Sequence, residues 1–438
     1  MPPNPAEPPS AFWPPVPDHT YTAPAIRLFF QLVMDAACSL RSASAVMQLL
    51  KGLWPTLSRR PVANTGQWWL LRVGLFELTR PKEIADDWIW IVDHTVQIGT
   101  VKCLVIVGCR LSQWQSQQRP LEHRDLQVLA LEPVEKSNGM AVCRQLQATC
   151  EKMGSVPRAV ISDEGTDLLS GYREFLKLHP ETAICFDMAH QAAKLLKREL
   201  EADDRWGMFL AAAGTTKQRL AQTPLAPLLP PTPRSKARYM NLDELVTWGD
   251  RALHYLNDPR PREGWAMDRA LLENKLGWLR DYREALAEWK SVMKVIATAC
   301  HYARHRGYGA GAATELQQQL AEPATTPMSQ RLAERLVIFV AKQSAAARSG
   351  ERLPGSSECL ESLIGKGKRL EGQQSQSGFT KMILGMAAAV VEPSHDYLLR
   401  ALAAVKTKHV LSWCRDHLGI SVQAKRYHAL VAPGTKIG

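Results

Sequence analysis

The chain has 438 residues, of which 45% are hydrophobic and 22% are charged, and its formal net charge is +11. These proportions exclude a wholly disordered or collagen-like chain and are those of a globular protein. At roughly 150 residues per domain, the length indicates about three domains, or one large domain that carries an insertion. A positive charge of this size suits a polyanionic partner, although many globular proteins share it.

The positive charge is concentrated in two stretches near the ends of the chain. Residues 24–80 contain seven Lys or Arg and two Asp or Glu, and residues 340–438 contain fourteen and seven. The rest of the chain is close to neutral. This distribution predicts two nucleic-acid-facing ends around a centre that can hold acidic residues for another purpose. The alternative is that the basic ends only improve solubility.

Cysteine usage and the N-terminal sequence indicate a reduced, cytosolic protein. The nine Cys are scattered singly without a C-x-x-C pair, unlike a disulfide scaffold or a zinc knuckle. Residues 1–17 are Pro-rich, lack the basic and apolar regions of a signal peptide, and are expected to form a disordered arm. The longest apolar run, residues 382–391, is too short to span a bilayer. We therefore expect a cytoplasmic protein with no membrane contact.

A helical segment follows this arm. Apolar residues recur at helical spacing over residues 24–50, and another helix is expected over residues 66–78, after a Pro-bounded link. Helix, turn and helix with a basic face is the shape of a small DNA-reading module. We therefore expect an arm at residues 1–23 and a helix-turn-helix-like DNA-binding domain at residues 24–84, although any helical bundle can begin this way. Its candidate DNA contacts are Arg59, Arg60 and Arg72.

From residue 88 the pattern changes to short apolar strands. Three strands come first, and helices then alternate with two further strands. Strands joined by tight turns are antiparallel, whereas strands joined by helical crossovers are parallel. The order therefore predicts an α/β fold with a mixed sheet flanked by helices. The expected strands are residues 88–93, 101–111, 126–134, 159–161 and 183–186, and the expected helices are residues 139–153, 166–178 and 189–200.

Strand signals stop beyond residue 201. The pattern is mostly helical over residues 241–342, and further helices are expected over residues 378–391 and 405–418. We interpret residues 85–200 as the first part of the core, residues 201–349 as an all-helical insertion, and residues 350–438 as the completion of the core with basic C-terminal helices.

Two aspartates end apolar strands of this predicted sheet. Asp93 is the last residue of the first strand and Asp163 comes at the end of the fourth. Aspartate at the end of a strand is common in turns, so neither residue is specific by itself. In a strand order that makes the first and fourth strands neighbours, the two carboxylates would lie side by side. Adjacent carboxylates repel unless they share a proton or a cation, and two Mg²⁺ ions about 4 Å apart with a third carboxylate resolve this repulsion.

The strand order resembles the RNase H-like fold of DDE transposases, whose active site contains two Asp and one Glu. The segment Asp187-x-x-His190 is similar to the (C/D)xxH motif of Mutator-type and hAT-type transposases, which also place an all-helical insertion before the Glu. After the insertion, Ser356-Ser-Glu-Cys-Leu-Glu361-Ser resembles the segment around the third carboxylate in bacterial insertion-sequence transposases. By that match the third carboxylate is Glu361 rather than Glu358.

The resemblance implies a set of metal ligands and a reaction. Asp93, Asp163 and Glu361 would hold two Mg²⁺ ions, with Mn²⁺ as a substitute, and catalyse DNA strand cleavage and strand transfer. His190 would contact the scissile phosphate or a flipped base, unless it only packs at the start of a helix. Trp265, Trp278 and Trp289 could stack on such a base, although helical spacing favours a core position. The other implied nucleic-acid contacts are Asp187, Lys366, Lys368 and Arg369.

The resemblance also implies partners. One partner is double-stranded DNA, both as the terminal inverted repeats and as the target. The other is a second copy of the chain, in a homodimer on DNA. The protein would then be associated with the nucleoid. Many Mutator-type and hAT-type members carry an N-terminal zinc finger, and this chain has no such Cys and His spacing. Two alternatives stay open: an RNase H-like structure-specific nuclease, and a catalytically inactive or repurposed DNA-binding protein derived from a transposase.

Overall fold

The computed structural model describes residues 16, 20–51, 60–96, 101–117, 119–232, 242–257, 268–373 and 378–430. The chain divides into two compact units. The sheet unit is assembled from Met1–Gln117, Leu121–Ile184 and Ser357–Gly438, and the helical unit from Gln118–Pro120 and Cys185–Ser356. Within the described ranges, no helix combines the length and the apolar character needed to cross a membrane. Most of the expected N-terminal arm, Arg59 and Trp265 lie outside the described residues.

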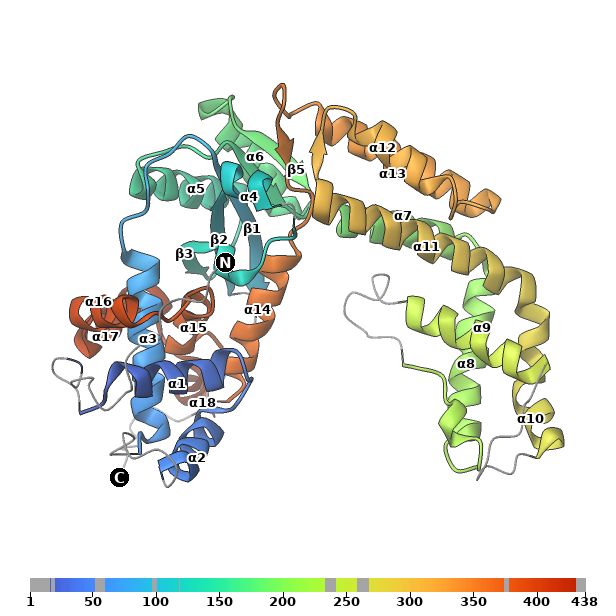
Figure 1. Cartoon of the computed structure of the whole chain (residues 1–438), viewed down its shortest axis with the longest axis horizontal. Helices are drawn as coiled ribbons and strands as arrows, with labels where there is room; N and C mark the ends of the chain where they lie inside the picture. The colour runs from blue at the N-terminus through green and yellow to red at the C-terminus, as the bar shows by residue number, and fades with distance from the viewer. Residues whose placement is uncertain are drawn as a thin grey trace, which may run out of the picture. The chain divides into compact units, whose positions relative to one another are not determined.

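The sheet unit contains a five-stranded mixed sheet in the order β3-β2-β1-β4-β5 (Figure 1). β1 is antiparallel to β2, and β2 is antiparallel to β3, whereas β1 and β4 run parallel. The predicted mixed sheet flanked by helices is therefore confirmed. The first and fourth strands are neighbours, which was the condition for bringing Asp93 and Asp163 together. The strands are β1 (Trp88–Val96), β2 (Lys102–Arg110), β3 (Gln127–Val134), β4 (Ala159–Ser162) and β5 (Ala183–Phe186).

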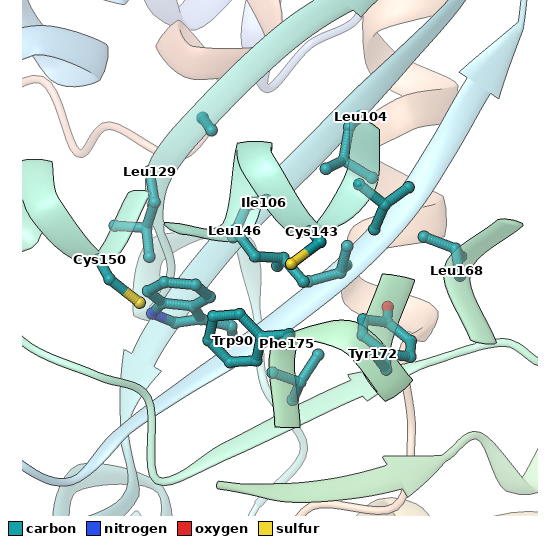
Figure 2. Packing of buried hydrophobic residues seen from close by; sticks show 14 of the residues in the cluster. Trp90, Leu104, Ile106, Leu129, Cys143, Leu146, Cys150, Leu168, Tyr172 and Phe175 are labelled. Carbon is teal, nitrogen blue, oxygen red and sulfur yellow. The ribbon is translucent and has the colours of Figure 1, made fainter. Parts of the chain in front are cut away.

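Two helices cover one face of this sheet. α5 (Gly139–Met153) and α6 (Thr166–Leu178) pack on each other and enclose a buried hydrophobic cluster with residues of the strands (Figure 2). Trp90 and Val92 of β1 belong to this cluster. Because side chains alternate along a strand, Asp93 belongs to the opposite face of the sheet.

α14 (Glu358–Glu371) lies over that opposite face. Val105 of β2 stands opposite Asp93 in the ladder, so Cys109, four residues further on, points to the same face. Burial raises the pKa of Cys109, and the neighbouring thiol of Cys359 in α14 raises it further. The helix that carries the predicted third carboxylate therefore covers the face of the sheet to which Asp93 belongs.

The N-terminal helices pack against the C-terminal helices within the sheet unit. α3 (Ala63–Thr79) contacts α15 (Leu384–Ala388) and α16 (His395–Ala404), and a Cβ on Gly74 would stand only 2.0 Å from Leu384 O. The segment expected to be a separate DNA-binding domain thus shares a compact unit with the sheet. The other helices of this unit are α1 (Ala23–Met34), α2 (Leu40–Lys51), α4 (Leu111–Gln117), α17 (Thr407–Leu418) and α18 (Val422–Leu430), with 3-10 turns η2 (His123–Asp125) and η6 (Lys381–Ile383).

The C-terminal helices differ from the expected ones. Instead of one helix over residues 378–391, the chain forms the short turn η6 and then α15, whose residues are all buried. An apolar run that is buried on every side has no polar face, so its periodicity does not define a helix length. α16 was not predicted, although Ser394 caps it by accepting a hydrogen bond from Tyr397 N at 3.2 Å.

The helical unit is built around an aromatic core. The ring of Trp289 lies 4.9 Å from that of Trp206 and 5.1 Å from that of Phe209, between ring centres, and Trp278 packs against Phe209. Trp289 is fully buried, which confirms its predicted core position. The helices of this unit are α7 (Met188–Glu201), α8 (Asp204–Leu220), α9 (Asp243–Asn257), α10 (Arg269–Leu276), α11 (Arg283–Arg306), α12 (Ala312–Leu320) and α13 (Pro327–Ser344), with 3-10 turns η3 (Ala226–Leu228) and η5 (Gly277–Tyr282).

The expected insertion is not purely helical. Within it, β6 (Tyr308–Gly309) pairs antiparallel with β7 (Arg352–Leu353) beyond its end. The cause is local, because Gly307 ends α11 with a φ of 65°, a value that few residues other than glycine adopt. The chain leaves α11 in an extended conformation, and its next two residues form β6, which pairs with β7.

Candidate functional site

Asp93 and Asp163 come directly after the residues that pair β1 with β4. In this parallel ladder the last pair is Val92 opposite Ser162. Neighbouring strands lie about 4.8 Å apart, so the next residue on each strand brings the two carboxylates to the same edge of the sheet. Both aspartates are half-buried.

The sequence pattern predicted that the first strand ends at Asp93, but β1 extends beyond it. It continues to Val96 because its ladder with β2 runs on until Val96 lies opposite Lys102, whereas its ladder with β4 stops at Val92. The predicted strand end is therefore wrong for the pairing of β1 with β2. It agrees with the point at which the pairing of β1 with β4 stops. Asp93 occupies the point at which β1 passes beyond β4.

A backbone N–H group holds one oxygen of each aspartate. Asp93 Oδ1 accepts a hydrogen bond from His94 N at 2.6 Å, and Asp163 Oδ1 accepts one from Gly165 N at 3.0 Å. Hydrogen bonds of this kind fix the direction of a carboxylate. The side chains of Asp93 and Asp163 are therefore each oriented by a backbone N–H group one or two residues further along the chain.

Glu361 lies in the first turn of α14 and is half-buried, and α14 contacts β1. In the part of the chain that the structure describes, no three His, Cys, Asp or Glu side chains form a group that could hold a metal ion. The structure thus brings together two of the three predicted ligands and puts the third on the helix that covers the same face. Carboxylate oxygens are the donors that Mg²⁺ prefers, so the chemistry of Asp93 and Asp163 fits the predicted ion.

Four residues that the sequence reasoning missed form a polar cluster on the α5 and α6 side of the sheet. Lys102 Nζ donates to Asp167 Oδ2 at 2.8 Å, and His94 Nδ1 lies 3.7 Å from the same oxygen. On its other side, His94 Nε2 lies 3.2 Å from Ser137 Oγ. Burial alone would raise the pKa of Asp167, but the hydrogen bonds from Lys102 and Ser137 and the nearby positive charges lower it to about 2.

The charges of three carboxylates act on the buried Tyr172. Burial raises the pKa of Tyr172, and the charges of Asp163, Asp93 and Asp167 raise it further. A Cβ on Gly165 would stand 3.2 Å from Asp163 Oδ1 and 3.5 Å from Asp167 Oδ1, so a larger side chain at this position would meet both carboxylates. The sequence signal was the spacing Asp163-Glu-Gly-Thr-Asp167, which places a second acid at the start of the next helix.

In the helical unit, Asp187 and His190 form the start of α7. Asp187 is buried and is the N-cap of the helix, where its Oδ1 accepts a hydrogen bond from His190 N at 2.8 Å and lies 3.2 Å from His190 Nδ1. Capping by itself explains an Asp three residues before a His. A DNA contact by either residue stays a prediction.

Three of the arginines predicted to contact DNA make contacts inside the sheet unit. Arg72 donates to the carbonyl groups of Leu402 and Val405 at the end of α16, and Arg369 donates to Val33 O at 3.0 Å. Arg60 Nε donates to Ser44 Oγ at 3.1 Å. These contacts favour structural roles for the three side chains. On α14, Lys368 is exposed and Lys366 is half-buried.

No protein-family model matches the chain, and the search of curated proteins finds no match either. The function is therefore inferred from the residues of the site and their geometry.

Proposed function

We propose that the protein is the DNA transposase of a bacterial insertion sequence, with an RNase H-like core of DDE type. The observation that carries the proposal is the pair Asp93 and Asp163 at the edge where β1 passes β4. Three antiparallel strands, two strands reached through helices, and a Glu-bearing helix over the face of Asp93 support it further. Such an edge suits phosphodiester chemistry, because neighbouring carboxylates bind divalent cations that stabilise charged oxygens.

Each acidic residue has a role in this proposal. Asp93, Asp163 and Glu361 would hold two Mg²⁺ ions, or Mn²⁺ in their place, with Glu361 supplied by α14. Bound ions of this kind lower the pKa of an attacking water or DNA 3′-hydroxyl and neutralise the leaving oxygen. Lys366 and Lys368, further along α14, would bind DNA phosphates.

The N-terminal helices would provide the DNA-end-binding surface, with α2 as the contacting element. α3 is buried along most of its length, and its Arg72 is engaged by α16. α2 instead exposes Arg41, Ser42, Gln48 and Lys51, side chains that can contact phosphates and base edges. A homodimer would place two such helices on the two inverted repeats of the element, at the nucleoid.

The test is cleavage of a DNA duplex that carries the inverted repeats flanking the coding sequence. Asp93→Asn, Asp163→Asn and Glu361→Gln are each expected to slow Mg²⁺-dependent cleavage and strand transfer at least about 100-fold, because each removes a charged ligand. DNA binding in gel-shift experiments should stay roughly unchanged. Glu358→Gln, on the same turn of α14, is the matched control and should cleave at the wild-type rate.

Each other outcome has a definite meaning. Cleavage at the wild-type rate by any of the three variants contradicts the role of that residue. Cleavage of branched DNA without a strand-transfer product would favour a structure-specific nuclease. Binding of the repeats without any metal-dependent cleavage would favour an inactive DNA-binding protein derived from a transposase.

A further inference from the structure

The C-terminal part of the sheet unit contains two helices that are joined by a very short link. α16 ends at Ala404 and α17 begins at Thr407, so only Val405 and Lys406 separate them, both with an extended backbone. Val405 is buried, whereas Lys406 is exposed. α3 contacts both helices (Figure 1). Two helices with a tight link, supported by a third helix, have the connectivity of a helix-turn-helix unit.

Hydrogen bonds fix both residues of the link. Arg72 of α3 donates from Nε to Val405 O and from Nη2 to Leu402 O, which satisfies backbone carbonyl groups at the end of α16. At the start of α17, Lys406 N donates to His409 Nδ1 at 3.2 Å. The first turn of α17 is therefore held in a defined place relative to α3 and α16.

α17 has a buried face and an exposed face. Val410 and Trp413 are buried, and the ring of His417 stacks on that of Trp413 with 4.8 Å between ring centres. Lys408 and Arg415 are both exposed. They lie on one line along the helix, because seven residues make almost two turns, and at 3.6 residues per turn this line is opposite the buried face.

The exposed face carries side chains of the kinds that contact DNA. Ser412 lies one turn from both Lys408 and Arg415, and its Oγ accepts a hydrogen bond from Arg415 Nη2 at 3.1 Å. Beside them, Leu411 is 54% exposed. Asp416, the acidic residue of α17, lies at the margin of this face, 3.7 Å from Arg415 Nε. We call Lys408, Leu411, Ser412 and Arg415 the α17 stripe.

We infer that α17 is a recognition helix, which lies in the major groove of duplex DNA and contacts it through the α17 stripe. The inference adds a second DNA-binding element to the one assigned to α2, and it rests on the proposed function only in taking DNA as the ligand. Lys and Arg contact phosphates, Ser contacts phosphates or base edges, and an apolar side chain contacts the methyl group of thymine.

Charge and spacing favour duplex DNA as the occupant of this face. Residues 405–418 contain three Lys or Arg and one Asp. Lys408 and Arg415 are about 10 Å apart along the helix axis, and the major groove is about 12 Å wide, so the two cations can reach phosphates on both of its sides. A contact with thymine also gives a reason for the exposure of Leu411.

The test measures DNA binding by the full chain with Lys408→Gln and Arg415→Gln combined, called the stripe variant. Fluorescence anisotropy follows a duplex with the inverted repeats and an unrelated duplex of equal length, between about 50 and 200 mM salt. The slope of log affinity against log salt is expected to fall by about two, and the affinity at about 100 mM salt about tenfold to hundredfold, because two phosphate contacts are lost. The urea midpoint should stay unchanged, since both side chains lie opposite the buried face.

A second measurement locates the groove. Wild type should protect guanine N7, an atom of the major groove, from dimethyl sulfate, and the stripe variant should lose this protection. A stripe variant with wild-type affinity, salt slope and protection would overturn the inference. Tighter binding of wild type to single-stranded DNA or duplex RNA of the same sequence would also overturn it, because α17 needs the wide major groove of B-form DNA.

The matched control removes the same charge from the helical unit. Arg269 in α10 and Lys342 in α13 are exposed, and the variant with Arg269→Gln and Lys342→Gln should bind DNA like wild type. If this control loses as much affinity as the stripe variant, only the net charge matters and the inference fails. A basic helix face that merely improves solubility would give that result.

Failure of the proposed function gives other results. Arg41→Gln combined with Lys51→Gln tests the surface on α2. Loss of repeat binding in that variant, with wild-type binding in the stripe variant, would overturn only the role of α17. Binding of the repeats through the α17 stripe without metal-dependent cleavage would support the role of α17 and contradict the transposase. A wild-type chain that binds no duplex DNA would contradict both.

Discussion

The sheet unit and the helical unit bring their polar residues together in different ways. In the sheet unit, Asp93 and Asp163 are far apart in sequence and meet because β1 and β4 are in register. In the helical unit, Asp187 and His190 are three residues apart and meet through the cap of α7. Strand register concentrates like charges that need a counter-ion, whereas capping joins a donor to an acceptor and needs none. The sheet edge is therefore the stronger candidate for metal-dependent chemistry.

The largest loss of stability is expected from the central tryptophan of each unit. Trp90 and Trp289 are both fully buried, and replacing such a residue by Ala lowers the free energy of unfolding by about 3–5 kcal/mol. Hydrogen exchange followed by mass spectrometry should show faster exchange in β1 and β2 for Trp90→Ala, and in α8 and α11 for Trp289→Ala. Equal acceleration in both units for either variant would contradict the division of the chain.

A smaller effect, of opposite sign in the two units, is expected from a pair of helical glycines. In α3, a Cβ at Gly74 would strike the backbone oxygen of Leu384, so Gly74→Ala should lower the free energy of unfolding by about 1–3 kcal/mol. In α8, Gly207 is exposed with open space around it, so Gly207→Ala should raise it by about 0.5–1 kcal/mol. Urea titration measures both. A stabilised Gly74→Ala variant would refute the close contact of α3 with α15.

The smallest effect concerns the acid stability contributed by Asp167. Its pKa is about 2 in the folded chain and about 3.9 in an unfolded one, so the unfolded state binds more protons between these values. The stabilisation is present above about pH 4 and is lost as the pH falls toward 2. The difference in unfolding free energy between wild type and Asp167→Asn, measured without metal, should therefore shrink over this range. A difference independent of pH would mean that Lys102 and Ser137 do not stabilise the charged carboxylate.

The sequence predicted the fold best where capping residues and the order of strands and helices define an element. α5 follows the cap Asn138 and ends at Gly154, whose φ is 64°, and its predicted and observed bounds coincide. The crossover rule predicted that the later strands are parallel, and the pairing of β1 with β4 meets the condition under which Asp93 and Asp163 were expected to lie side by side.

Other contacts could not be read from the sequence for physical reasons. Lys102 meets Asp167 only because the start of β2 and the first turn of α6 come together in the fold, and no periodicity encodes that contact. Arg72 looked like a DNA contact because a basic residue on a helix has no visible partner until the C-terminal helices are in place. Glu361 was located by resemblance, and its approach to the aspartates depends on how α14 crosses the sheet.

The central claim is that Asp93 and Asp163 share a divalent cation at the edge of the sheet. Anomalous diffraction from crystals soaked in Mn²⁺ tests it most directly. The account predicts a peak about 2.1–2.2 Å from a carboxylate oxygen of each aspartate, which disappears in Asp163→Asn. A wild-type crystal with no peak at this edge, or with its peak on Asp167 and away from Asp93, would contradict the account.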